Sequence, residues 1–290
     1  MTWTAFGPMM IAACERFLPP EARIVDDDLA PRLLPPALRL LIRLPAARRA
    51  LVAGSERRLP GIWASVLCRK RYADDQVRAA LEAGVDQVVV LGAGLDTRAC
   101  RLAGPKVRAF ELDLPDNVAR KRRRLTRAFG RVPEGLTLVP IDFDRGGLAR
   151  TLATAGFRAD RPAVFVWEAV TQYLSEDGVR ATLASLSRAA PGSRLLFTYV
   201  RRDFLDGVNL YGGGRMRRDF VERRPVFRFG LLPEEVAGLL APYGWAEAEQ
   251  AGPAEYAARY LRPSRRDRGL SAPTEIERFV LATTAAAREG

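Results

Sequence analysis

The apolar positions near the N-terminus recur at helical spacing, in short pieces that prolines separate. None of these pieces alternates between apolar and polar residues as a half-buried strand does. We therefore expect residues 1–75 to form an all-helical cap, of the kind that closes over a pocket in α/β proteins. The expected helical pieces are 9–17, 29–44 with proline breaks, 46–53 and 61–72.

From residue 76 onward, apolar runs of strand length alternate with amphipathic helical stretches. A helix over 76–83 leads into the first run, and this regular alternation predicts an α/β fold with a doubly wound, mostly parallel sheet over 76–290. The expected strands are 87–91, 107–113, 136–141, 163–168, 194–200, 245–250 and 277–284. The expected helices after them are 115–129, 146–156, 175–190 and one opening at Pro233.

Two glycines follow the first strand-like run. The β-branched run 87–91 is typical of a strand buried on both faces, and Gly92 and Gly94 directly after it predict a tight turn into a helix. The next run ends at Asp113, about 20 residues later, the spacing at which a carboxylate binds a ribose diol. Thr97 stands where a dinucleotide fingerprint needs a third glycine, which argues against a pyrophosphate. This favours a nucleoside cofactor such as S-adenosyl-L-methionine, although a plain strand-to-helix turn would give the same glycines.

Three longer motifs occur in a characteristic order, at 91–98, 110–115 and 167–174. They read Leu-Gly-Ala-Gly-Leu-Asp-Thr-Arg, Phe-Glu-Leu-Asp-Leu-Pro and Trp-Glu-Ala-Val-Thr-Gln-Tyr-Leu. They resemble the leucine carboxyl methyltransferase family, and more closely its bacterial branch of S-adenosylmethionine-dependent O-methyltransferases, some of which esterify polyketide carboxylates. The resemblance extends over 8–284 and implies a class I methyltransferase, Rossmann-like sheet whose last two strands form an antiparallel hairpin.

The resemblance also implies a set of cofactor-binding residues. The backbone of the glycine turn would contact the methionine and ribose portions, Asp113 would accept from the ribose hydroxyls, and Asp142 with Phe143 would hold the adenine. An arginine near 70 would pair with the cofactor carboxylate, with Arg71 the match by position and Arg69 the alternative. The implied cofactor-binding residues are Arg71, Gly92, Ala93, Gly94, Asp96, Asp113, Leu114, Asp142, Phe143 and Glu168.

Glu168 and Tyr173 are the implied catalytic residues. Glu168 ends an apolar strand, where a carboxylate is costly unless paired, so either it contacts the cationic cofactor or it caps the next turn. Tyr173 resembles a tyrosine that lines the methyl-transfer site. Asp142 could equally be a helix cap, and we expect Arg98 to be structural.

The acceptor is less explicit in the sequence. Residues 201–232 carry three consecutive glycines and many arginines, which favours a substrate-side insertion, and a flexible linker would look similar. In this family the segments around Tyr211, Arg215, Glu255 and Tyr260 border the acceptor pocket, and an arginine fork suits a substrate carboxylate. The implied substrate-binding residues are Tyr211, Arg215, Tyr256 and Arg259.

The chain contains no histidine. This removes the usual general base, the usual metal ligand and every Ser-His or Cys-His nucleophile. An alcohol needs a base before it can be alkylated, whereas a carboxylate is already ionised at pH 7. We therefore expect a metal-independent O-methyltransferase that esterifies a small acid and releases S-adenosyl-L-homocysteine. A phenol or hydroxyl O-methyltransferase, a cyclase or cofactor-binding protein without methyl transfer, and a nucleic-acid or protein methyltransferase stay open.

The formal charge of +12 could indicate an anionic partner. Only Lys70, Lys106 and Lys121 are lysines, however, and arginine accompanies abundant alanine and leucine, as in a genome-wide composition bias. We expect no nucleic-acid partner, no membrane partner and, from the dispersed cysteines, a cytoplasmic location. The oligomeric state is open.

Overall fold

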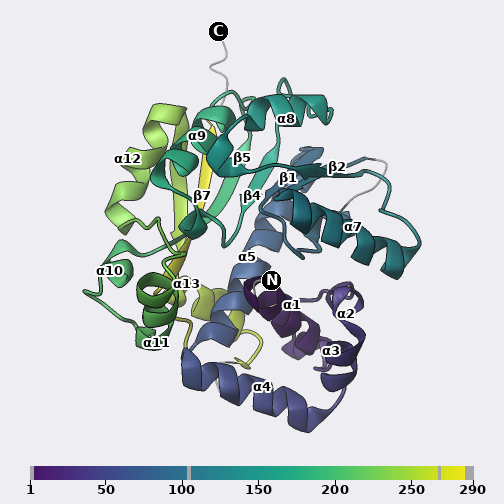
Figure 1. Ribbon diagram of the computed structural model, residues 1–290, viewed down its shortest axis with the longest axis vertical. Coiled ribbons are helices and arrows are strands. Elements are labelled where there is room, and N and C mark those ends of the chain that lie inside the picture. Colours follow the sequence, from purple (N-terminus) through teal and green to yellow (C-terminus); the bar gives the residue numbers. More distant parts are fainter. Residues whose placement is uncertain (1–2, 103–105, 267–268, 285–290) are drawn as a thin grey trace.

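A computed structural model describes residues 3–102, 106–266 and 269–284 of the chain. These residues form a seven-stranded sheet with helices on both faces and a group of helices at one end (Figure 1). The strand order is β3-β2-β1-β4-β5-β7-β6, and β7 runs in the opposite direction to the other six strands of this sheet. The predicted fold class is confirmed. The strands are β1 (Gln87–Leu91), β2 (Arg108–Asp113), β3 (Leu136–Pro140), β4 (Val164–Trp167), β5 (Arg194–Val200), β6 (Trp245–Ala251) and β7 (Glu277–Thr284).

The central strand β1 is buried along its whole length, as its unbroken β-branched run predicts. Val88 and Val90 pack into one apolar core with the N-terminal helices, whereas Val89 and Leu91 pack into a second core on the opposite face. The strand order reverses between β1 and β4, because the chain first builds β2 and β3 on one side and then crosses to the other. Ligands of open α/β sheets bind beyond the carboxyl ends of the strands at such a point.

The N-terminal helices lie at those carboxyl ends. The chain leaves β7 at the top of Figure 1, so the parallel strands, which run opposite to β7, end at the lower edge beside α1 and α5. Prolines separate the short helices of the cap, as the sequence predicts. These helices are α1 (Trp3–Glu15), α2 (Ala30–Leu33), α3 (Pro36–Leu41), α4 (Pro45–Arg58) and α5 (Ile62–Glu82).

Helix α5 corrects one expectation. The separate helices predicted over 61–72 and 76–83 are one continuous helix of 21 residues. The polar residues between them do not break it, because Asp74 is buried and accepts a 2.7 Å hydrogen bond from Arg98 Nε. The proposed boundary between cap and methyltransferase domain, at 75, therefore falls inside a helix, and the division stays a prediction.

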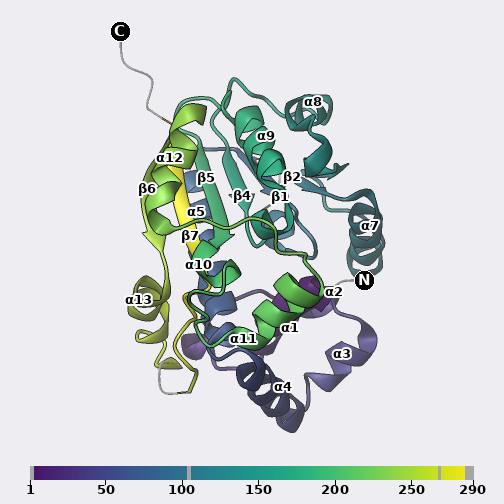
Figure 2. The ribbon, with the colours of Figure 1, turned by 60° about the vertical axis from the view of Figure 1, so that its left-hand side comes forward.

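Helices cover both faces of the sheet. Helix α7 packs on the face that carries Val88 and Val90, and α8, α9 and α12 pack on the other. Short helices occupy the expected insertion 201–232 and lie between the lower ends of the strands and α4 in Figures 1 and 2. The remaining helices are α6 (Arg98–Leu102), α7 (Pro115–Phe129), α8 (Leu148–Thr154), α9 (Glu176–Leu186), α10 (Arg202–Leu205), α11 (Gly214–Arg217), α12 (Val236–Leu240) and α13 (Pro253–Tyr256). Shorter turns include the 3-10 helices η2 (Phe143–Arg145) and η3 (Thr171–Tyr173) and the π-helices η4 (Arg218–Arg223) and η7 (Ala257–Leu261).

Candidate functional site

The glycine turn lies at the end of β1, between β2 and the loop that follows β4. The amides of Gly92 and Ala93 donate to the carbonyl oxygen of Leu112, at 2.7 and 3.0 Å. Gly92 has φ +69°, and a Cβ atom there would lie 2.4 Å from Cγ2 of Val170. Glycine at 92 is therefore required by the left-handed backbone and by a close protein neighbour.

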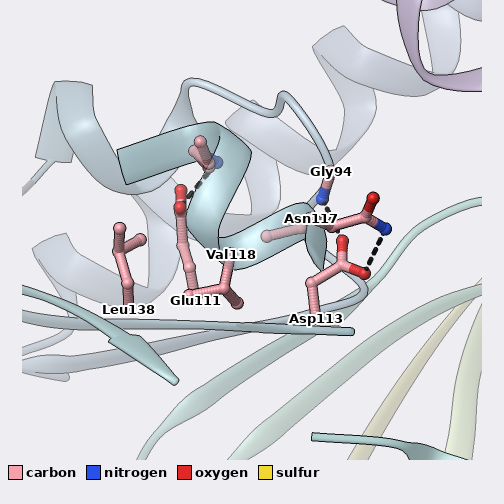
Figure 3. Close-up of a pocket in the computed structure, with 8 residues that line it drawn as sticks. Gly94, Glu111, Asp113, Asn117, Val118 and Leu138 are labelled. Atoms are coloured by element: carbon pink, nitrogen blue, oxygen red, sulfur yellow. Dashed lines mark hydrogen bonds and ion pairs between the residues drawn. The ribbon is translucent and has the colours of Figure 1, made fainter. Parts of the chain in front are cut away.

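Asp113 lies directly beside this turn (Figure 3). Its Oδ2 accepts from the Gly94 amide at 2.6 Å, and its Oδ1 accepts from the Leu114 amide and from Asn117 Nδ2, each at 2.7 Å. Each carboxylate oxygen has about two acceptor positions, so Asp113 retains capacity for further donors. A small hollow lined by Ala93, Gly94, Asp113 and Asn117 adjoins the carboxylate.

These residues fit an adenosine. The carboxylate is held in place by the turn, as a ribose diol requires, and the side chain of Leu114 next to it is 47% exposed. An exposed leucine beside a carboxylate offers an apolar surface that an adenine ring can cover.

A buried acidic and a buried basic side chain, which were not among the predicted site residues, lie behind Asp113. Glu111 and Lys121 are both almost fully buried, and Lys121 Nζ lies 2.5 Å from Glu111 Oε2, although not in a hydrogen-bonding direction. Lys121 Nζ also donates to the carbonyl oxygen of Asp96 at 2.5 Å, which ties α7 to the glycine turn. Burial raises the pKa of Glu111 to about 7, against the opposing effect of Lys121. The available signal was a glutamate inside an otherwise apolar strand, two residues before Asp113.

Arg98 is the centre of a buried ion network. Its guanidinium donates to Asp74 at 2.7 Å, to Asp96 at 2.9 Å and to Glu168 at 3.0 Å, and its side chain is 1% exposed. Asp96, an expected cofactor-binding residue, also accepts from the backbone amide of Arg98 at 2.5 Å and lies 3.6 Å from Lys70 Nζ. The network therefore joins the glycine turn to α5 of the cap.

Glu168 is paired with two arginines, and its expected contact with the cofactor stays a prediction. Its carboxylate is shared by two arginines: Oε1 accepts from Arg69 Nε at 2.8 Å and Oε2 accepts from Arg98. Burial alone would raise the pKa of Glu168, but Arg98 and then Arg69 hold it below its ordinary value. The glutamate is thus kept ionised at the tip of β4.

Of the two candidate arginines, Arg69 lies with the site and Arg71 does not. Arg69 is buried and contacts Glu168 and also Glu277 of β7. Arg71 donates to Asp75 at 2.8 Å and to the Ile24 carbonyl at 3.2 Å, and its side chain is 41% exposed. Residues two apart on a helix point about 200° apart, so α5 cannot present both to one pocket. The structure thus places Arg69 beside Glu168 and Arg71 on another side of the helix, and the role of either at the cofactor carboxylate stays a prediction.

The expected adenine residues follow β3. Asp142 is the N-cap of η2 and accepts from the Asp144 amide at 3.2 Å, which is the capping role considered as its alternative. Phe143 is buried among the apolar residues of the second core. The described residues thus bring the turn, Asp113 and Arg69 with Glu168 to the lower edge of the sheet, with Asp142 at the end of the neighbouring β3.

The sequence profile of the leucine carboxyl methyltransferase family matches residues 5–187, more than half of the chain. The chain belongs to this family. A protein of Streptomyces avermitilis is 33% identical over 205 residues, which are 69% of this chain and 68% of that protein. One of Frankia alni is 33% identical over 227 residues, 75% of each chain. Both carry provisional names as S-adenosyl-L-methionine-dependent methyltransferases, and this chain is an S-adenosyl-L-methionine-dependent methyltransferase.

Solved structures agree with the fold. A crystal structure from Thermobifida fusca, provisionally described as a methyltransferase, matches with a TM-score of 0.58 at 20% identity and covers 83% of this chain and 89% of that one. A second, from Streptomyces avermitilis, matches with a TM-score of 0.55 at 16% identity, over 83% of this chain and 91% of that one.

The four residues expected at the acceptor lie in two separate groups. Tyr211 donates its hydroxyl to Asp203, beneath the guanidinium of Arg201, and Arg215 is exposed on α11 nearby. Tyr256 is buried with its ring 6.4 Å from Tyr72. Arg259 is paired with Glu249 and lies over the Tyr72 ring. The structure does not gather these four residues into one pocket.

Tyr173 belongs with the Tyr211 group. Its ring meets Phe227 edge-on at 5.4 Å, and both tyrosines pack against an apolar cluster that joins the cap to the insertion. The buried residues of this cluster are Leu59, Val200, Phe204, Phe227 and Ile276. Met216 and Phe220 of the insertion pack on it as well.

Among the described residues, no group of three or more potential ligands could hold a metal ion. No helix among them is long and apolar enough to cross a bilayer.

Proposed function

We propose that this methyltransferase transfers a methyl group to a carboxylate oxygen of a small acid, such as a secondary metabolite, and so forms a methyl ester. S-adenosyl-L-methionine supplies the electrophilic methyl group, which is activated by its sulfonium. The protein would contribute binding, alignment and exclusion of water, because a sulfonium methyl needs little acid or base assistance.

The observation that carries the proposal is that neither Glu168 nor Tyr211 is suited to act as a base at neutral pH. Glu168 is held ionised by two arginines, with its pKa below the ordinary value. Burial, followed by the hydrogen bond to Asp203, raises the pKa of Tyr211 to about 12. The chain also lacks histidine. An acceptor at this site would therefore have to arrive already deprotonated, as a carboxylic acid does at pH 7.

Glu111 is the exception, since its pKa of about 7 would suit a base. Its carboxylate is paired with Lys121 of α7. Glu111 lies on the same strand as Asp113, the expected ribose ligand (Figure 3). We therefore assign it to supporting the glycine turn through Lys121, not to proton transfer from the acceptor.

We assign the cofactor residues as follows. The backbone of 92–94 and the carboxylate of Asp113 would hold the methionine and ribose portions, and Arg69 would replace Arg71 at the cofactor carboxylate. Asp96 would act through Arg98, keeping the turn in register with α5. Leu114, Asp142 and Phe143 would surround the adenine, and Glu168 would lie near the sulfonium.

On the acceptor side, the apolar cluster supports an acid with an apolar body. Tyr173 and Tyr211 border this cluster, and Arg215 is an exposed cation at its margin that could pair with a carboxylate. Arg259 is less suited, because it lies over the ring of Tyr72, which packs in another core and not in this cluster.

The test is methyl transfer from labelled S-adenosyl-L-methionine to a panel of aliphatic and aromatic carboxylic acids and matched phenols. We expect label on acids, released by mild alkali because a methyl ester hydrolyses. Alkali-stable label on the phenols would favour an ether-forming enzyme. Cofactor binding without transfer to any acceptor would favour a cyclase or binding protein.

A further inference from the structure

We propose that Arg228 and Asp144 form a clasp that links the cofactor side of the site to the acceptor-side segment 201–232 and positions Tyr173. Neither residue touches the reacting groups in this proposal, so both are positioning residues. The inference rests on the proposed function, because it concerns how cofactor binding is passed to the acceptor side.

Asp144 is fixed at the cofactor end. It lies in η2, next to Asp142 and Phe143, and its Oδ1 accepts from the amide of Ser175 at 3.1 Å and from Ser175 Oγ at 2.9 Å. Ser175 is the N-cap of α9. A Cβ atom on Gly178 would lie 2.3 Å from Asp144 Oδ1, so the absence of a side chain at 178 lets the aspartate reach this helix end.

Arg228 is fixed at the acceptor end and reaches three places. Its Nη2 donates to Asp144 Oδ2 at 2.5 Å and to the carbonyl oxygen of Tyr173 at 2.6 Å, and its Nε donates to that carbonyl at 3.0 Å. Its backbone amide donates to the Gln172 carbonyl at 2.7 Å. The planar guanidinium makes the contacts to Asp144 and to the Tyr173 carbonyl at once, and a lysine ammonium on a flexible stem would not hold both in the same geometry.

The clasp sits next to the aromatic residues of the acceptor side. Phe227 precedes Arg228, stacks on Phe220 of η4 at 5.2 Å and meets the Tyr173 ring edge-on. Arg228 therefore holds the backbone of Tyr173 while its neighbour holds the ring. If the η2 loop moved, Asp144 would move Arg228, and Arg228 would in turn shift the carbonyl of Tyr173 and the ring contact between Tyr173 and Phe227.

The ion pair between Arg228 and Asp144 is too weak to contribute much to folding, but it is strong enough to couple the η2 loop to the segment that carries Arg228. Both side chains are partly exposed, 45% for Arg228 and 32% for Asp144, and ion pairs at such sites contribute little to folding. A contact of this strength can open without unfolding the molecule, and cofactor bound beside η2 would favour its closed form.

Hydrogen exchange with and without S-adenosyl-L-homocysteine tests the clasp and needs no acceptor. In the wild-type protein we expect the ligand to slow exchange both around 92–114 and around 172–173 and 220–228. In Arg228→Ala and Asp144→Ala the ligand should still slow exchange around 92–114. The slowing around 172–173 and 220–228 should fall about 2- to 5-fold. Gly178→Ala should have the same effect without removing a charge, and Arg228→Lys should restore only part of it.

Arg223→Ala is the matched control, because Arg223 pairs only with Asp219 of its own helix among the described residues. It should retain the wild-type protection. Undiminished protection of 172–173 and 220–228 in both alanine variants would overturn the clasp while leaving the proposed function standing. No calorimetric binding of the ligand by the wild-type protein would instead overturn the proposed function and the clasp with it.

Discussion

Replacement of Arg98 by methionine tests the buried ion network most directly. Methionine keeps an unbranched side chain but removes one cationic partner from each of Asp74, Asp96 and Glu168. Removing one partner of a buried ion pair costs about 3–5 kcal/mol. Each carboxylate keeps a second cation, respectively Arg101 at 2.8 Å, Lys70 at 3.6 Å and Arg69 at 2.8 Å.

We therefore expect the lower end of that range, a loss of about 3 kcal/mol in the free energy of unfolding. For a chain of this size the melting temperature should fall by about 6–12 °C. The measurement is urea denaturation at pH 7, followed by tryptophan fluorescence. Arg180→Met is the control, because its pair with Glu176 is exposed and should contribute about 0.5 kcal/mol or less.

The loss should also depend on pH. Burial opposes ionisation, but Arg98 holds the folded-state pKa values of Asp74 and Glu168 below their ordinary values. Such carboxylates stabilise the fold above their unfolded pKa values, and that contribution disappears as the pH falls through the folded ones. The difference in free energy of unfolding between the variant and the wild type should thus be largest at pH 7 and should become smaller below about pH 4.5. A variant within about 1 kcal/mol of wild type at pH 7 would refute this account of the network.

Three further outcomes are expected. Asp113→Ala should weaken binding of S-adenosyl-L-homocysteine by about 1–3 kcal/mol in calorimetry with unchanged circular dichroism, and unchanged affinity would remove the ribose assignment. The folded state keeps a proton on Glu111 up to about pH 7, so this carboxyl should lower wild-type stability as the pH rises from about 4.5 to 7. Glu111→Gln should lack that pH-dependent component in urea titrations, and an identical pH profile would contradict the raised pKa. Gly92→Ala should cost about 1–3 kcal/mol, because it strains a backbone at φ +69° and meets Val170, and a neutral effect on melting would count against this packing.

The sheet was predictable because its strands are continuous apolar runs separated by turn residues. The run at 87–91 and the interval to Asp113 depend only on local sequence, and the structure places that carboxylate beside the glycine turn. Tight turns and strand spacing are short-range properties, and a sequence carries them directly.

Two features were not predictable from local sequence: which face of a helix is buried, and which side chains pair with residues far away in the chain. The choice between Arg69 and Arg71 depends on which face of α5 is buried, and sequence alone left both open. Glu168 pairs with Arg69 and Arg98, which are 99 and 70 residues away in the sequence. No local sequence pattern therefore reveals that two arginines share this carboxylate. The contacts of Arg228 were not predictable for the same reason, because its partners Tyr173 and Asp144 are 55 and 84 residues away in the sequence.

The single helix α5 constrains how a ligand can enter. Because this rod of 21 residues runs from the cap into the sheet's apolar core, the cap cannot swing about residue 75 as a hinged door would. The chain turns sharply just before this helix, where Gly61 has φ +79° and a Cβ atom would lie 2.0 Å from the Ala272 carbonyl oxygen. A bulkier residue at 61 would therefore strain the backbone and meet that carbonyl at the junction between the other cap helices and α5.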